Sequence, residues 1–486
     1  MLSVASMLVL ARIVGVSDSM DIWVLAFSYV SGAGMIMWGP VNELLRSKYI
    51  RLKNKSSAEE VYEYVISLIN ATILLNCLVV FLFFITYVTD VDVFKAVLQP
   101  QYKAKFLLIM LIMTPSLILS QFASVSACLI NCHDILYMPE LIGILGGFFN
   151  ILIVYLFYEK YGIYSLVTGY YVSLLISICY GLQFYWKSGF LKPKRILSLN
   201  FRHFRYFYQG APILAIAYFA GQFNGLYEKS VAANMGVGYV SLVNYASQIK
   251  GTLQAVFASV IITLIVPTLS KINYREHGQS FYRNFSQGQS IVLLSLLILI
   301  PIITSSSASL TVLIFSKKIG LNTQFNIFSN LLVLYTACLF PIALYLIFGF
   351  GLISQGKEKV YALVAIAAQV ISTLITYSFS SYIKSVIFPM SLFISHTIAA
   401  LLMLHFLEIG SKRKIVQKFI IYGLATLLVS LGISFVKHSF LLIYPWPPMV
   451  DITISLMLGL VVGLLATFFD SEIKVSFLSR LGSRFV

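Results

Sequence analysis

Three basic residues, Arg12, Lys229 and Lys250, fall within stretches of sequence that are apolar enough to cross a membrane. A charged side chain at mid-membrane costs at least about 2.5 to 3.5 kcal/mol, so each one needs a partner, a water-filled cavity or a route to the interface. Lys250 follows the predicted start of its helix by about 16 Å of helical rise, which is too deep for easy access to the interface. Lys250 is therefore a candidate for binding an anionic ligand in a polar cavity, with a structural ion pair as the alternative.

The other candidates for such a cavity are Arg12, Lys229, Arg46 and Asn224. Arg12 and Lys229 lie near the predicted outer ends of their helices, so reaching out to the interface explains them as well as ligand binding does. Arg46 follows Glu43 by three residues near the inner end of a predicted helix. That spacing is also typical of an ion pair at a helix end. Asn224 shares its predicted helix with Lys229.

Two acidic residues, Asp21 and Glu228, are candidates for binding a proton or a sodium ion. Glu228 directly precedes Lys229, and neighbours in a helix point about 100° apart, so the two cannot both face one site. The cysteines show no CxxC spacing and are interpreted as small core residues. The sequence therefore predicts no disulfide framework, no metal site and no cofactor.

The elements that must hold these charges are membrane helices. Of the 486 residues, 59% are hydrophobic and only 11% are charged, and the mean hydropathy is +0.89. Soluble domains are far less apolar. Windows of membrane-spanning length recur almost from end to end and predict about fourteen transmembrane helices. The sequence thus predicts an all-α polytopic membrane protein and excludes a soluble enzyme.

The formal net charge of +16 is scattered among short loops, so a nucleic-acid partner is not indicated. If the N-terminus lies inside, the loops on that side carry most of the lysines and arginines, whereas Lys437 is among the few assigned to outer loops. The positive-inside rule therefore favours a location in the cytoplasmic membrane with both termini in the cytoplasm.

Two local echoes indicate an internal duplication. ARIVGV at 11–16 recurs in outline as AANMGV at 232–237, and Ser-Lys at 47–48 recurs at 270–271, both with an offset of about 220 residues. Both pairs occupy matching places relative to predicted helices, which is typical of a parallel repeat of six helices. The predicted parts are a six-helix bundle at 1–186, a basic cytoplasmic linker at 187–209, a second six-helix bundle at 210–409, and two extra helices with a tail at 410–486.

Three stretches together resemble the MurJ/MviN-like lipid flippases of the multidrug/oligosaccharidyl-lipid/polysaccharide exporter superfamily. They are ARIVGVSDSMDIWVLAFSY, EKSVAANMGVGYVSLVNYASQI running into VPTLSK, and ISQGKEK. The resemblance implies two bundles facing a central cavity, two C-terminal helices lining a lipid-facing groove, and alternating access that carries an undecaprenyl-diphosphate-linked sugar. Asp21 matches an aspartate that the family places at the start of its second helix. Ser247 and Gln248 stand where members often have an acidic-arginine pair.

The predicted function is to flip a lipid-linked saccharide, either a peptidoglycan precursor or another cell-surface polysaccharide unit. Its diphosphate brings about two negative charges into the membrane, which basic residues in a low-dielectric cavity favour. Gly356-Lys357 is followed by Glu358 and lacks the upstream glycine of a nucleotide-binding loop, so the expected energy source is an ion gradient, the membrane potential or downstream consumption of product. Two alternatives stay open: a cation-coupled multidrug exporter of the same superfamily, and a membrane glycosyltransferase or polymerase. The chain is expected to act as a monomer among membrane lipids.

Overall fold

A computed structural model describes most of the chain as helices. The described residues are 2–89, 100–133, 135, 137–188, 200–209, 211–261, 265, 269, 278–315, 322–441 and 447–469. Among these residues there is no strand, which confirms the predicted all-α class. Contacts divide the chain into two units, Met1–Ser241 and Leu242–Val486.

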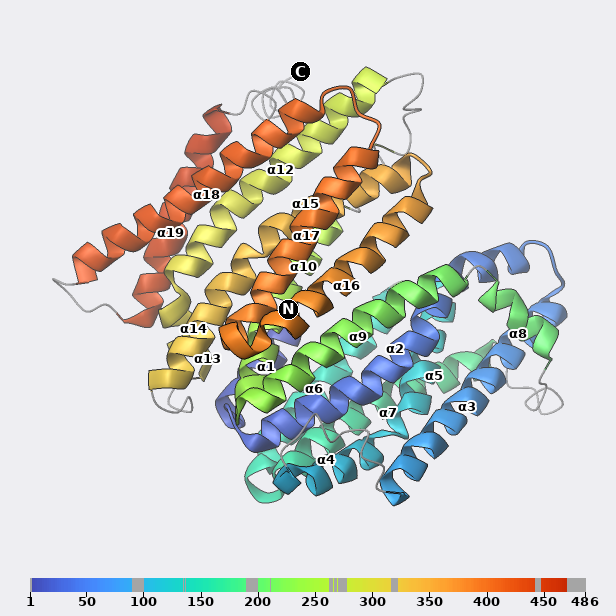
Figure 1. Ribbon diagram of the computed structural model, residues 1–486. Helices are drawn as coiled ribbons and strands as arrows, with labels where there is room; N and C mark the ends of the chain where they lie inside the picture. The colour runs from blue at the N-terminus through green and yellow to red at the C-terminus, as the bar shows by residue number, and fades with distance from the viewer. Residues whose placement is uncertain are drawn as a thin grey trace. The chain divides into compact units, whose positions relative to one another are not determined.

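The first unit is organised around one long helix, α2, which contains 36 residues and rises about 54 Å. It packs against α4, α5 and α9, and Figure 1 shows α2 and α9 running side by side. The helices of this unit are α1 (Leu2–Ile13), α2 (Asp18–Lys53), α3 (Ala58–Val88), α4 (Pro100–Met113), α5 (Ser116–Asn131), α6 (Tyr137–Tyr161), α7 (Ile163–Lys187), α8 (Phe201–Tyr208) and α9 (Ala211–Met235).

Small residues let α2 and α9 approach closely. A Cβ atom added to Gly39 of α2 would clash with the ring of Tyr218 on α9. Further along the same seam, the hydroxyls of Tyr29 and Ser230 form a hydrogen bond of 2.9 Å. Close packing and interhelical hydrogen bonds hold membrane helices together, because lipid supplies no hydrophobic force between them.

The short helix α8 is fastened to the end of α2. The Lys48 ammonium donates hydrogen bonds to the carbonyls of Tyr206 at 2.7 Å, Phe207 at 3.1 Å and Gln209. These carbonyls belong to the last turn of α8 and the residue after it, where a helix leaves acceptors unsatisfied and a cation is favourable. Burial lowers the pKa of Lys48. The chain entering α9 is therefore held in place by a charge on α2.

The second unit has its apolar core on α12, α15 and α17, where Phe285, Phe348 and Met403 are buried. Helix α12 also packs against both α18 and α19. The elements are α10 (Tyr239–Val260), α12 (Gly278–Ser305), α13 (Ser307–Phe315), α14 (Asn322–Ala337), α15 (Leu339–Ser354), α16 (Glu358–Ile383), the 3₁₀ turn η3 (Lys384–Val386), α17 (Ile387–Phe406), α18 (Lys412–Leu441) and α19 (Pro448–Phe469).

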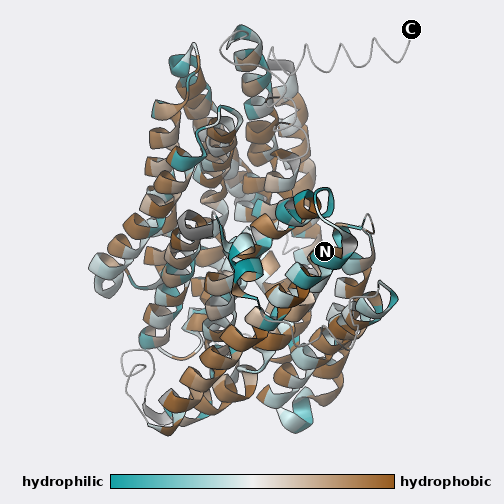
Figure 2. Cartoon of the chain, turned by 90° about the vertical axis from the view of Figure 1, so that its right-hand side faces the viewer, coloured by the Kyte–Doolittle hydropathy of each residue, from teal (hydrophilic) through white to brown (hydrophobic). Residues whose placement is uncertain are grey.

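The helices carry apolar residues along most of their length, with hydrophilic residues gathered toward the helix ends (Figure 2). Among the described residues, ten helical stretches are long and apolar enough to cross a membrane, and one of them, Glu358–Phe406, contains both α16 and α17. Exposed side chains such as Leu428 and Phe435 fit a lipid environment rather than water. The chain is a multi-pass membrane protein, and the count of fourteen spans stays a prediction.

Gly15 and Gly236, the glycines of the repeated pattern, occupy similar positions at the ends of helices. Gly15 follows α1 with φ of 68°, and Gly236 follows α9 with φ of 130°. Glycine adopts positive φ without steric cost and commonly ends helices in this way.

The predicted bundle boundaries stay predictions. Contacts group α9 with the first unit, and residues 189–199 of the predicted linker lie outside the described part.

Candidate functional site

Lys229 is held in the seam between α9 and α2. Its ammonium donates to the Ser28 hydroxyl oxygen at 2.6 Å, and that hydroxyl donates in turn to the carbonyl of Val24 at 2.5 Å. The Ser28 proton is thus used within α2, which leaves its lone pairs facing the lysine. An ammonium group has three N–H donors, so it can hold Ser28 and an anionic ligand at the same time. Neither Ser28 nor its distance from Lys229 could be read from the sequence.

Two further candidates lie beside Lys229 on α9. Asn224 is buried and Glu228 is half-buried. Residues four apart in a helix lie on the same face, so these two share one face of α9. The negative charge of Glu228 acts on the neighbouring Lys229 ammonium. The first unit therefore gathers one cation, one anion and one amide within about a turn and a half of helix.

Asp21 caps the start of α10. One carboxylate oxygen accepts from the backbone N–H of Gly238 at 2.5 Å, and the other accepts from the backbone N–H of Ser241 at 2.7 Å and from the Ser241 hydroxyl. A helix N-terminus presents unsatisfied N–H groups and a partial positive charge, so a carboxylate is favourable there. Asp21 therefore has a structural role, and its predicted role in ion binding stays a prediction.

The two arginine candidates lie at helix ends. Arg12 is in the last turn of α1 and is exposed, and Arg46 is exposed on α2. The side chain of Glu43, the predicted ion-pair partner of Arg46, lies outside the described side chains. Both arginines stay candidates, and the structure does not bring either of them into contact with Asn224 or Lys229 by a described hydrogen bond.

Lys250 lies half-buried on α10 in the second unit, and its positive charge acts on the buried imidazole of His396 on α17. The Nδ1 atom of His396 lies 3.0 Å from the carbonyl of Leu392. A carbonyl can only accept, so Nδ1 carries a proton in this hydrogen bond. The Tyr345 ring packs edge-on against the imidazole at 5.1 Å. His396 was not predicted, because a lone histidine in an apolar stretch carries no spacing signal.

An apolar groove lies among α12, α14, α15, α17 and α18. Its volume is about 570 Å³. Three of the hydroxyls that line it, those of Thr304, Thr426 and Ser430, donate to carbonyls of their own helices. With these protons used, the groove offers mainly hydrocarbon surface. Its lining residues are Ile300, Thr304, Val333, Ala337, Phe340, Phe393, Phe419, Ile420, Gly423, Leu424, Thr426, Leu427, Ser430, Leu431 and Ser434.

A second, smaller hollow of about 180 Å³ continues along α18 toward its Lys412 end. It is lined by Leu344, Phe348, Thr397, Ala400, Leu401, Leu404, Val416, Phe419 and Ile420. The two hollows share Phe419 and Ile420. From Val416 to Ser434 the helix rises about 27 Å, which is close to the thickness of a bilayer's hydrocarbon core, about 30 Å.

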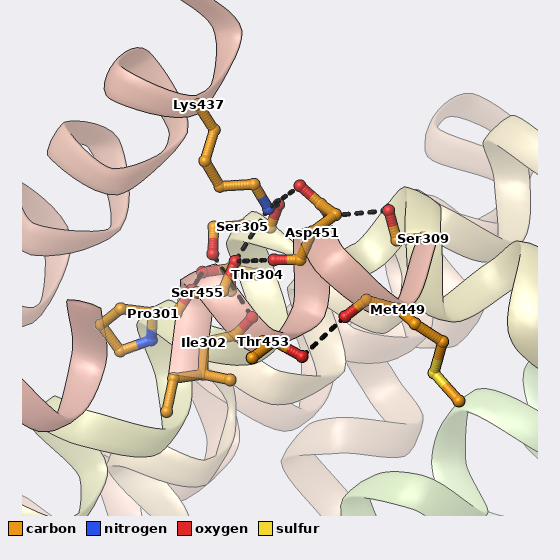
Figure 3. Close-up of polar contacts among 10 residues, drawn as sticks. All are labelled: Pro301, Ile302, Thr304, Ser305, Ser309, Lys437, Met449, Asp451, Thr453 and Ser455. Carbon is orange, nitrogen blue, oxygen red and sulfur yellow. Dashed lines mark hydrogen bonds and ion pairs between the residues drawn. The ribbon is translucent and has the colours of Figure 1, made fainter. Parts of the chain in front are cut away.

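A buried ion pair stands near the other end of the groove, where Lys437 of α18 meets Asp451 of α19 at 2.7 Å (Figure 3). The ammonium also donates to the Ser305 carbonyl at 2.7 Å and to the Ser455 hydroxyl at 2.8 Å, and the Ser309 hydroxyl donates to Asp451 at 2.6 Å. We call this group the Lys437–Asp451 network. It joins α12, α13, α18 and α19.

The assignment of Lys437 to an outer loop was wrong. Lys437 lies within α18, and only 3% of its surface is exposed. Hydropathy ends a predicted span at a charged residue, but a lysine whose charge is neutralised by a neighbouring helix can stay inside. The available signal was a pair of opposite charges, Lys437 and Asp451, at the adjoining ends of two consecutive predicted helices. The sequence did not show that these two side chains face each other.

Comparison with known proteins places this arrangement among lipid transporters. The family model described as "Lipid II flippase MurJ" matches residues 10–450. A solved structure of the lipid II flippase MurJ in an inward closed conformation has a TM-score of 0.79, with 18% identity and 96% of each chain covered.

More distant structures share the fold. An inward-facing multidrug resistance MATE family transporter of the MOP superfamily has a TM-score of 0.59, with 12% identity, and covers 85% of this chain and 98% of its own. A MOP superfamily transporter from Pyrococcus furiosus has a TM-score of 0.54 and 13% identity. The match covers 86% of this chain and 95% of that transporter. No curated protein matches the sequence.

Proposed function

Because the chain belongs to the lipid II flippase MurJ family, we propose that it moves a polyprenyl-diphosphate-linked saccharide across the cell membrane by alternating access. The family match over residues 10–450 carries this proposal. MurJ flippases are transporters, and we propose that this chain catalyses no covalent chemistry and needs no cofactor. The saccharide is a peptidoglycan precursor or a related cell-surface unit.

Each of two lysines is a candidate for binding the diphosphate, Lys229 in the first unit and Lys250 in the second. Both are ammonium groups held partly inside apolar helices, where attraction to a phosphate is worth about 4 kcal/mol at roughly 4 Å if the effective dielectric constant is about 20. Ser28 holds Lys229 on α2 without neutralising it. In the second unit, the charge of Lys250 acts on His396, a side chain that carries no negative charge.

The polyprenyl tail would lie in the apolar groove along α18. Lipid is as apolar as the groove lining, so the tail gains no hydrophobic free energy by entering it. Binding must come from close packing, which returns about 0.1 to 0.2 kcal/mol for each pair of touching heavy atoms. The larger hollow follows α18 from Phe419 to Ser434, about 22 Å of helical rise, and offers many such contacts.

We also propose how the chain is oriented in the membrane, which ion drives it and in which oligomeric state it acts. We place both termini in the cytoplasm, because the basic loops then lie inside. A proton or sodium ion would drive the cycle, with Asp21 and Glu228 as the candidates for binding it. Both Asp21 oxygens accept hydrogen bonds from the α10 terminus, so ion binding there would have to compete with these bonds. The chain would act as a monomer.

The test uses the full chain reconstituted into vesicles with a fluorescent lipid-linked saccharide, and it follows the fraction that an impermeant quencher can reach. Lys250→Gln should weaken apparent affinity about tenfold to a hundredfold, as expected from losing a charged hydrogen bond of about 1.5 to 3 kcal/mol. Lys250→Arg should retain part of the activity, and Lys359→Gln, which removes an exposed lysine of the same unit, should change nothing. Absence of flipping by the folded wild-type protein would overturn the proposal.

A second candidate function rests on the likeness to MATE transporters, with a TM-score of 0.59. A cation-coupled exporter of organic cations wants a site with net negative charge, whereas Lys250, the candidate in the second unit, has the opposite sign. Uptake of an organic cation into the same vesicles, driven by an imposed ion gradient, would favour this alternative.

A further inference from the structure

An aromatic pair lies where the two hollows along α18 meet. Phe419 lines both the hollow of about 570 Å³ and the hollow of about 180 Å³. Its ring packs against that of Phe340 on α15, with centroids 4.8 Å apart and planes inclined at 34°. We call this pair the Phe419–Phe340 wall.

One turn further along α18, Gly423 allows Phe340 to come this close. A Cβ atom on Gly423 would lie 3.2 Å from the Phe340 ring, closer than ordinary contact. A larger residue at that position would push Phe340 away from its place beside Phe419. The wall therefore depends on three residues from two helices, Phe419 and Gly423 of α18 and Phe340 of α15.

A groove open to lipid needs such a feature if it is to prefer one chain over another. Phospholipid tails surround the protein and are as apolar as a polyprenyl chain, so hydrophobicity cannot distinguish them. Packing can distinguish them, because interiors are close-packed and a void of even one methylene forfeits contacts. The position at which the groove closes then decides how much of a chain is held by protein.

We propose that the Phe419–Phe340 wall sets how many isoprene units of the substrate tail are held in the groove, so that Phe419 is a specificity-determining residue for tail length. This inference rests on the proposed function. In the wild-type protein the tail occupies the larger hollow and leaves the groove at Phe419. When the ring is removed, the two hollows become one, and a longer part of the tail packs against α18.

The experiment measures initial flipping rates in vesicles for a series of lipid-linked saccharides with increasing numbers of isoprene units. The wild-type rate should rise with tail length and then level off once the larger hollow is filled. In Phe419→Ala the rate should level off at a longer tail. We call the tail length at which the rate levels off the levelling point. Adding Leu401→Phe to the Phe419→Ala variant places a larger side chain in the smaller hollow and should return the levelling point toward the wild-type length.

Phe435→Ala is the matched control, because Phe435 lies on the same helix, is 73% exposed and lines neither hollow. The levelling point does not depend on total activity, so a variant that is merely less stable should keep it. If the alanine variant does not fold, Phe419→Leu shortens the wall and provides the same test.

The possible results separate the two proposals. A wild-type protein that flips no substrate of any tail length contradicts the proposed function. A wild-type protein that flips all tails equally, as it would if a resident phospholipid filled the groove, overturns the inference alone. The same is true if Phe419→Ala levels off at the wild-type length.

Discussion

Replacing Lys437 by methionine removes the cation of the Lys437–Asp451 network and keeps most of the volume of the side chain. The Lys437 and Asp451 side chains are only 4% and 7% exposed, so the Asp451 carboxylate would stay buried with the Ser309 hydroxyl as its described donor. Breaking a buried pair by removing one partner costs about 3 to 5 kcal/mol. Lys437→Met should therefore lower the free energy of unfolding by about that amount.

The double variant Lys437→Met/Asp451→Leu removes both charges. Replacing a buried ion pair by apolar residues of similar size is often neutral or stabilising, so this variant should recover most of the lost stability. The matched control is Lys357→Met. Lys357 pairs with Glu408 at 2.6 Å, but their side chains are 24% and 59% exposed, and exposed pairs contribute only about 0 to 1 kcal/mol.

The assay is reversible unfolding of the purified chain in mixed micelles, followed by tryptophan fluorescence for the four proteins in parallel. Lys437→Met should be the least stable of the four, and the double variant should be more stable than Lys437→Met. Equal stability of Lys437→Met and Lys357→Met would refute the claim that burial gives the Lys437–Asp451 network its strength. A double variant no more stable than the single one would show that the hydroxyl contacts, and not the charge balance, hold these helices.

Three further predictions concern the first unit. Asp21→Asn should lower the free energy of unfolding by about 1 to 3 kcal/mol, because an amide nitrogen would then face buried N–H donors, and unchanged unfolding would contradict the capping role. Gly39→Ala should destabilise by about 1 to 3 kcal/mol through overpacking, whereas Gly221→Ala, where no atom lies within 4 Å, should be neutral or slightly stabilising; equal thermal shifts for the two would argue against close α2–α9 packing. Ser28→Ala should weaken substrate affinity while leaving protein abundance normal, and unchanged flipping kinetics would remove Ser28 as the residue that positions Lys229.

The sequence by itself determined the class of the protein. Hydropathy is a property of short windows, and a window of about 20 apolar residues has no alternative to a helix in lipid, since every backbone polar group must be satisfied within the segment. Gly15 and Gly236 entered the sequence analysis only as part of a repeated pattern, and the structure gives the local reason for them, since both have positive φ, which favours glycine. The family, too, was recognisable from short stretches.

Only the tertiary structure decided which side chains each charged residue contacts. Lys229 bonds to Ser28, which lies 201 positions away, and Asp21 bonds to Ser241, which lies 220 positions away. Each residue turns a helix by about 100°, so a small error in a helix boundary or rotation moves a side chain to a different face. Lys437 shows the consequence. Its local sequence ends a span and predicts a loop, and its place in the fold is set by a carboxylate on the next helix, because a partner of opposite charge is one way to compensate a charge buried within membrane helices.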